Sequence, residues 1–244
     1  GMDKRSVREA LANLAYQYQY SIPKDLHAIH RLREYFSQVF DYKLPHSSPN
    51  YAIDRAKLRQ PECRLPGKYV VFVHLASWST KLWPTENWQQ LVQLALSAGF
   101  DVVMPSGSDE EMRRGEMLAT GHTGVHALPR LSLSEVAWII NRASGVVSCD
   151  TGLCHLAAAL DKPTVSFYGP TDAGLIGATG DQQAHIIADN FKCAPCYQKQ
   201  CTYAGKPSSE AACMRAMQPL SVWEILSSLL AKADSATIDV VPQS

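Results

Sequence analysis

The sequence predicts an α/β fold in which a mostly parallel β-sheet is covered by helices on both faces. From residue 68 onward, short apolar runs alternate with amphipathic stretches of helical spacing, and that alternation is typical of strands joined by crossover helices. Predicted strands cover residues 69–75, 99–105, 124–128, 145–149, 164–168 and, more weakly, 185–188. Predicted helices cover residues 85–97, 109–120, 132–143 and 152–160, and a last helix over 220–233 is expected to pack back onto the body.

The N-terminal part is predicted to be helical and to lie outside this sheet. Apolar residues at helical spacing predict one helix over residues 6–20 and a second over residues 25–40. Prolines without clear periodicity follow between residues 41 and 68, so this stretch is predicted to be an irregular linker. We therefore expect a helical segment and linker over residues 1–67 and a Rossmann-like domain over residues 68–244.

The composition argues against several classes of protein. Lys plus Arg number 23 and so do Asp plus Glu, so no overall basic field would attract nucleic acid. No apolar run approaches the roughly 20 residues that span a bilayer, and the first six residues lack the apolar region of a signal peptide. The odd cysteine number, seven, with Cys149 and Cys154 in an apolar stretch, favours a reducing compartment. We therefore expect a cytoplasmic protein.

Hydroxyl groups and a cation follow the first predicted strand. Ser77, Ser79 and Thr80 can donate hydrogen bonds, and Lys81 can hold a phosphate group as a point charge. Pro84 is well placed to precede the next helix. Capping of that helix would explain the serines and the threonine equally well.

Carboxylates follow the second predicted strand. Asp109, Glu110 and Glu111 suit a helix N-terminus because the helix dipole favours negative charge there, so ordinary capping is the main interpretation. The functional alternative is that one of these carboxylates accepts hydrogen bonds from ribose hydroxyls, as acidic residues do in dinucleotide-binding folds.

The most specific segment, residues 150–155, follows the strand predicted over residues 145–149. Thr151 and Gly152 open a helix whose first N–H groups have no helical partner, and glycine lets a pyrophosphate approach the backbone closely. His155 lies about one turn further on and reaches the same space. A lone histidine is more often structural, but beside Asp150 and Gly152 we favour a contact with a ligand.

Four cysteines lie near the C-terminal end, at positions Cys193, Cys196, Cys201 and Cys213. Two close thiols followed by two more suit zinc or an iron–sulfur cluster, yet their gaps match no standard zinc-finger spacing. Reduced structural thiols are the favoured interpretation, and zinc or a redox disulfide are the alternatives. We therefore expect no cofactor and no metal, with these four residues as the ligands if a metal is held.

Taken together, these stretches resemble the C-terminal domain of glycosyltransferase family 9, the ADP-heptose:lipopolysaccharide heptosyltransferases, and its type I members in particular. The resemblance covers nearly the whole chain. It is carried by residues 1–3 with the helix that follows, 27–36, 81–84, 148–160, 168–172 and 174–177. It implies the GT-B architecture, in which two Rossmann-like domains face each other across a cleft, the C-terminal one holding ADP-heptose and the N-terminal one the acceptor.

The resemblance also implies which residues contact the donor. Ser77 and Lys81 would bind the diphosphate, Glu111 the ribose, and Leu131 would line the adenine pocket. The phosphates and the heptose would be contacted by Asp150, Thr151, Gly152 and His155. Ala76 departs from the family pattern, because related enzymes often carry a hydroxyl residue there.

The function implied by the resemblance is inverting transfer of heptose from ADP-heptose to the Kdo of the lipopolysaccharide inner core. The catalytic residue is unknown here, because the family's presumed aspartate base belongs to an acceptor domain that would precede this chain. We therefore expect donor binding without efficient transfer, with the Kdo–lipid A acceptor held by that domain at the inner face of the inner membrane. The alternatives are a non-catalytic nucleotide-sugar-binding module and a GT-B transferase that uses another nucleotide sugar.

Overall fold

The structure, a computed structural model, describes residues 1–7, 9, 11–203, 208 and 210–238. The chain divides into two compact units. The smaller unit comprises residues 1–50 and 173–177, and the larger comprises residues 51–172 and 178–244.

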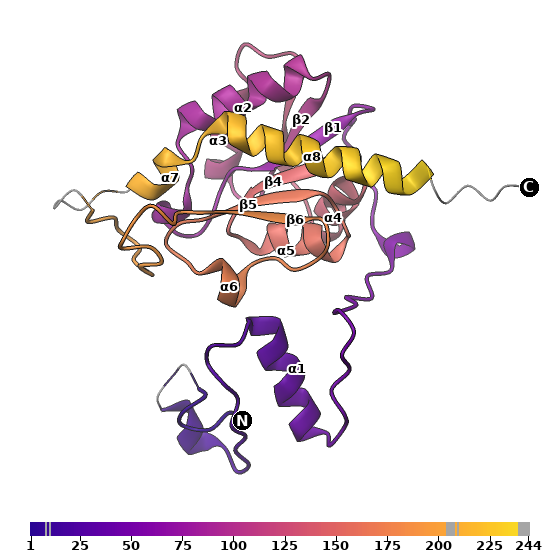
Figure 1. Ribbon diagram of the computed structural model, residues 1–244. Coiled ribbons are helices and arrows are strands. Elements are labelled where there is room, and N and C mark those ends of the chain that lie inside the picture. The colour runs from indigo at the N-terminus through magenta and orange to yellow at the C-terminus, as the bar shows by residue number, and fades with distance from the viewer. Residues whose placement is uncertain (8, 10, 204–207, 209, 239–244) are drawn as a thin grey trace, which may run out of the picture. The chain divides into compact units, whose positions relative to one another are not determined.

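The larger unit is built on a parallel six-stranded sheet with the strand order β3-β2-β1-β4-β5-β6 (Figure 1). The strands are β1 (Tyr69–Val73), β2 (Asp101–Ser106), β3 (Val125–Arg130), β4 (Gly145–Cys149), β5 (Thr164–Tyr168) and β6 (Gln183–Ile187). Every residue of β1, β4 and β5 is buried, which explains their unbroken apolar runs. The strand order reverses between β1 and β4, and the crevice outside the carboxyl ends of such a pair is where doubly wound sheets bind ligands.

Helices cover both faces of this sheet (Figure 1). One face packs with α2 (Thr85–Ser97), α3 (Asp109–Ala119) and α8 (Pro219–Ile238) around Phe72, Trp83 and Trp88. The other packs with α4 (Leu133–Arg142) and α5 (Gly152–Ala159) around Val71, Ile139 and Ile140. A short helix, α7 (Ala212–Ala216), precedes α8. The doubly wound α/β fold predicted from the sequence is therefore confirmed.

The larger unit also includes residues 51–67, which the sequence groups with the N-terminal segment. This stretch contains one short 3-10 turn, η2 (Arg55–Lys57), and is otherwise irregular, as predicted. Its apolar side chains pack against the core on the α4 and α5 face. These side chains are Ile53, Leu58, Cys63 and Leu65.

The smaller unit contains α1 (Ala28–Val39), which confirms the helix predicted over residues 25–40, and the short α6 (Ala173–Ile176). The helix predicted over residues 6–20 is wrong, because the described part of that stretch contains only a 3-10 turn, η1 (Ala12–Ala15). Leu11 and Leu14 are each 78% exposed, so the apolar stripe has no core to pack against. A short helix without tertiary packing is marginal in water.

The start of the chain is instead organised by side-chain hydrogen bonds. The Asp3 carboxylate accepts hydrogen bonds from the Ser6 N–H at 2.8 Å and the Ser6 hydroxyl at 2.6 Å, and the same hydroxyl accepts from the Ile22 N–H at 2.7 Å. The buried Arg31 of α1 donates to the Ser6 carbonyl at 2.6 Å. Short polar side chains of this kind compete with helix formation for the same backbone groups.

Among the described residues, no helix is long and apolar enough to cross a bilayer.

Candidate functional site

The predicted site residues lie on loops and on the first turns of helices at the carboxyl edge of the sheet. The loop after β1 contains the 3-10 turn η3 (Ser79–Lys81) and leads into α2. The loops after β2 and β4 lead into the first turns of α3 and α5. Parallel strands deliver all of these loops to one edge, so tertiary structure brings together residues that are far apart in the sequence.

The central feature of this edge is an ion pair between Lys81 and Asp150. Lys81 Nζ lies 2.6 Å from Asp150 Oδ2, and the two side chains are only 13% and 5% exposed. The Thr171 hydroxyl donates to the same carboxylate oxygen at 2.7 Å, and the Lys81 ammonium also lies 4.8 Å from the centre of the Trp78 ring. Asp150 therefore fixes the position of the Lys81 ammonium group.

The start of α5 supplies backbone donors beside this pair. Thr151 is the N-cap residue, but its side chain makes no capping hydrogen bond, and its carbonyl accepts from the Cys154 N–H at 3.1 Å. The first N–H groups of a helix have no helical acceptor and carry partial positive charge. A Cβ atom added at Gly152 would meet no atom within 4 Å, so the space in front of these donors is open. The helix start is suited to an anion, as predicted.

A cavity of about 320 Å³ lies between the segments that follow β1, β2, β3 and β4. Three of the predicted residues line it, namely Glu111, Leu131 and Thr151. Glu111 lies in the first turn of α3, and its Oε2 accepts the Gly107 N–H at 2.5 Å. The N-cap residue of that helix is Ser108, whose hydroxyl accepts the Glu111 N–H at 3.2 Å. Glu111 thus caps its own helix, as one interpretation predicted, and also faces the cavity.

Two residues of this cavity were not singled out from the sequence, His74 and Ser106. Burial lowers the pKa of His74 to about 4, so its ring is neutral at pH 7, and its Nε2 lies 3.3 Å from the Glu111 carbonyl oxygen. Ser106 is 3% exposed, and in the described part of the chain its hydroxyl has no hydrogen-bond partner. The sequence carries no signal for either role, because a serine at a strand end is ordinary turn chemistry.

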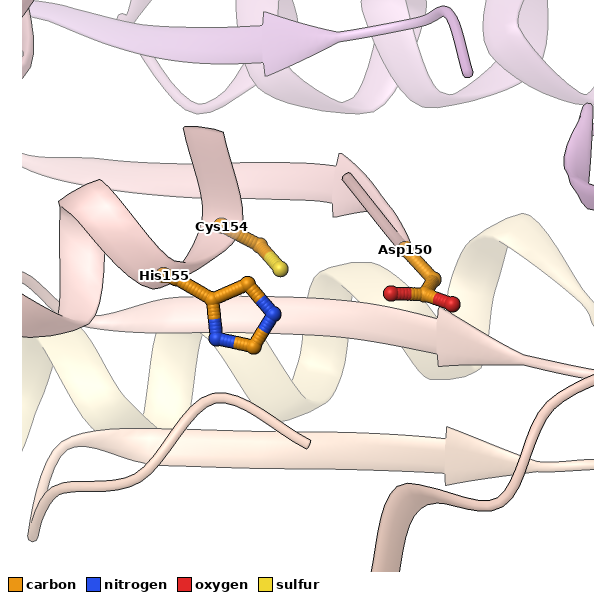
Figure 2. A group of neighbouring side chains, drawn as sticks. All are labelled: Asp150, Cys154 and His155. Carbon is orange, nitrogen blue, oxygen red and sulfur yellow. The ribbon is translucent and has the colours of Figure 1, made fainter. Parts of the chain in front are cut away.

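Ser77 and His155 lie apart from this cavity. Ser77 is exposed in the loop between β1 and η3 and does not line the cavity. His155 lies on α5 and points toward Asp150 and Cys154, as Figure 2 shows. The ligand atoms of His155, Asp150 and Cys154 all lie within 4.8 Å of one another.

That trio does not suit a metal ion. The Lys81 ammonium already occupies the Asp150 carboxylate, and a cation would have to displace it. The Cys154 thiol donates to the Thr151 carbonyl at 2.9 Å, and burial raises its pKa. The carboxylate and the thiol are thus already engaged in contacts within the protein.

The four C-terminal cysteines are gathered away from this trio. Cys193, Cys196, Cys201 and Cys213 line a single cavity of about 260 Å³. All seven cysteines of the chain are described, and all are free thiols, so the structure contains no redox disulfide.

The fold and this edge define a Rossmann-like domain with a helix start at its topological switch point whose N–H groups are suited to an anion. The chain belongs to glycosyltransferase family 9, because the model of that family, described as glycosyltransferase family 9 (heptosyltransferase), matches residues 1–206. Lipopolysaccharide heptosyltransferase 1 of Pseudomonas aeruginosa is 43% identical over 210 residues, which are 86% of this chain and 58% of that protein.

Solved structures agree with this membership. E. coli heptosyltransferase WaaC with ADP superposes with a TM-score of 0.75 and 34% identity, covering 94% of this chain and 65% of that one. The same enzyme with ADP-2-deoxy-2-fluoro heptose gives a TM-score of 0.66 and 38% identity, covering 76% and 57%. The chain thus spans between about half and two thirds of the length of these relatives.

Proposed function

We propose that this chain forms the donor-binding part of a heptosyltransferase that moves heptose from ADP-heptose to the Kdo of the lipopolysaccharide inner core. The observation that carries the proposal is the Lys81–Asp150 pair at the start of α5, next to a cavity lined by Glu111 and Leu131. The names of the relatives support the chemistry, since they are heptosyltransferases solved with ADP and with a fluorinated ADP-heptose.

The adenosine part of the donor would occupy the cavity of about 320 Å³. Leu131 supplies an apolar wall for the base, and a Glu111 carboxylate oxygen accepts hydrogen bonds from the ribose hydroxyls. The Ser106 hydroxyl is buried without a protein partner among the described residues, so a polar atom of the ligand would satisfy it.

The diphosphate would lie between Lys81 and the first turn of α5. The Lys81 ammonium is paired with Asp150, the residue just before the start of α5, so it and the first N–H groups of that helix would both face the diphosphate, and Ser77 would add a hydroxyl. As the glycosidic bond breaks, negative charge builds up on the departing ADP, and donors fixed in advance stabilise it best. Asp150 holds Lys81 in this role, and His155 is proposed to contact the heptose side.

We propose that the catalytic base is not Asp150. A general base must be free to accept a proton from the acceptor hydroxyl, and the Asp150 carboxylate is occupied by an ammonium and a hydroxyl group. The base would come from the acceptor-binding part of the enzyme, which also holds Kdo–lipid A. Because that acceptor is a lipid, we propose that the reaction takes place in the cytoplasm at the inner face of the inner membrane.

Isothermal titration calorimetry with ADP-heptose, ADP, UDP and GDP tests this proposal. We expect ADP and ADP-heptose to bind and the other two nucleotides to bind at least tenfold more weakly. Preference for UDP or GDP would instead indicate a transferase that uses another nucleotide sugar. No binding of any of the four at millimolar concentration would contradict the donor site itself.

A transfer assay addresses the remaining alternative, a non-catalytic binding module. The protein encoded by the full reading frame should transfer heptose to a Kdo-containing acceptor. Donor binding by that protein without any transfer would favour the module.

A further inference from the structure

The four C-terminal cysteines come from three separate stretches of chain that meet around one cavity. Cys193 and Cys196 lie three residues apart in the irregular stretch after β6, and Cys201 belongs to an isolated antiparallel bridge with Ser208. Cys213 lies on α7 and is buried. All four line the same cavity of about 260 Å³. The fold therefore brings four thiols to one cavity, which is the number of ligands in a closed tetrahedral site.

The Cys213 sulfur lies in the confined space between α7 and the loop after β5. A Cβ atom added at Gly169 would lie only 2.7 Å from the Cys213 sulfur, so the glycine leaves the room that this sulfur needs. This sulfur therefore lies at the cavity that the other three cysteines also line.

We propose that Cys193, Cys196, Cys201 and Cys213 form a structural site for one thiophilic divalent cation, Zn²⁺ or Fe²⁺. Each thiol loses its proton to the solvent as its sulfur binds, so up to four protons are released and the metal keeps its charge of two. Within the described chain no three of these sulfurs lie within 4.8 Å of one another, and a metal–sulfur distance of about 2.3 Å requires them to move closer. Metal binding would therefore draw the sulfurs of these four cysteines closer together.

Residues 197–199, between Cys196 and Cys201, form hydrogen bonds with the loop that carries Lys81 and with the loop after β5. The Thr80 hydroxyl donates to the Gln198 carbonyl at 2.7 Å, and the Ser79 hydroxyl donates to the Lys199 carbonyl at 3.1 Å. On the other side, the Tyr197 N–H donates to the Pro170 carbonyl at 2.7 Å. The metal would thus hold in place the turns that carry Lys81 and Thr171. This consequence, unlike the metal site itself, rests on the proposed function.

Metal analysis of the whole chain, purified without chelator and under reducing conditions, tests the site. Mass spectrometric elemental analysis should find about one equivalent of zinc or iron per chain, and the element found identifies the natural metal. Modification of the thiols with p-hydroxymercuribenzoate should release it to a chromogenic chelator. Less than about 0.1 equivalent, together with no uptake of added Zn²⁺ or Fe²⁺ at micromolar concentration, would overturn the proposal, as would a disulfide among the four.

Serine variants assign the ligands. Cys193→Ser changes an exposed side chain and Cys196→Ser a half-buried one, so the double variant should fold while losing at least 90% of the bound metal. Cys63→Ser is the matched control, because Cys63 is half-buried in a different core cluster, and it should keep the full equivalent. Full metal content in the Cys193→Ser, Cys196→Ser double variant would rule out these ligands.

Titration with ADP separates this inference from the proposed function. The double variant should bind ADP about fivefold to tenfold more weakly than the metal-loaded protein. Metal-loaded protein that does not bind ADP would contradict the proposed function alone. ADP binding by protein that neither contains nor takes up metal would contradict the metal site alone.

Discussion

Lys81 and Asp150 form a buried ion pair, with Nζ 2.6 Å from Oδ2, that joins the loop after β1 to the loop after β4. The two loops are adjacent because β1 and β4 pair in parallel across the switch point of the sheet. A salt bridge buried this deeply costs desolvation energy, so it is weak evidence for stability by itself. Because the pair lies at the carboxyl edge of the sheet, where an anion is expected to bind, we interpret it as part of the binding site.

Breaking this pair should affect stability and binding differently. Lys81→Met leaves the Asp150 carboxylate buried without its cation, and we expect the free energy of unfolding to fall by about 3 kcal/mol. The double variant Lys81→Met, Asp150→Asn should regain much of that loss, because no uncompensated charge remains, yet it should still bind ADP at least tenfold more weakly. Urea denaturation and calorimetry measure the two effects. A double variant that binds ADP like the wild type would show that Lys81 does not hold the diphosphate.

Ser106→Ala removes a buried hydroxyl group that has no partner within the described structure. Since burying an unsatisfied hydroxyl costs about 1 to 3 kcal/mol, the variant should be as stable as the wild type or more stable. Affinity for ADP should fall about fivefold, which corresponds to one lost hydrogen bond of about 1 kcal/mol.

Ser166→Ala is the control for this variant. Ser166 is a fully buried serine on β5 that does not line the cavity, so its replacement should leave ADP affinity unchanged. If both serine variants bound ADP with wild-type affinity, Ser106 would have no part in the site.

Gly152→Ala tests the anion site at the start of α5. A Cβ atom here meets no protein atom within 4 Å, so unfolding free energy should change by less than about 0.5 kcal/mol. The methyl group would occupy space next to the helix N–H groups, and ADP should bind at least tenfold more weakly. Wild-type ADP affinity in this variant would show that the diphosphate binds elsewhere.

Gly99→Ala provides the opposite pattern. Gly99 has a φ of +78°, which an alanine adopts only under strain, so stability should fall by about 1 kcal/mol while ADP affinity stays the same.

Stability should fall with acid between pH 6.5 and about 4 because of His74. Burial lowers the folded-state pKa of His74 to about 4, whereas an unfolded histidine titrates near 6.5. In that window the unfolded chain binds the extra proton and the folded chain does not, so unfolding is favoured as the pH drops. The contribution is up to about 3 kcal/mol at the acid end and vanishes above pH 7.

His74→Gln isolates this contribution. Glutamine keeps an N–H donor for the Glu111 carbonyl but does not titrate, so its unfolding free energy should change less over the same pH range. The measurement is urea denaturation at several pH values, and parallel pH profiles for the two proteins would contradict this role of His74.

Local patterning determined most of the larger unit. The predicted strands over 145–149 and 164–168 coincide with β4 and β5, and the predicted helix over 85–97 coincides with α2. Such segments are fixed by apolar runs and helical periodicity, since each buries its apolar side in one core. The same reasoning failed for residues 6–20, where Leu11 and Leu14 have the right spacing but no surface to cover them. Periodicity predicts a helix only where packing completes it.

The sequence by itself identified the loops that carry the candidate site, because strand ends and helix starts are local patterns. Tertiary structure alone decided which of those residues meet. It paired Lys81 with Asp150, placed Ser106 against the cavity with its hydroxyl unsatisfied within the described chain, and collected four cysteines from three stretches. The physical reason is that ion pairing, burial and thiol clustering depend on distances through space. Those distances are set by the order of strands in the sheet, and no local pattern encodes that order.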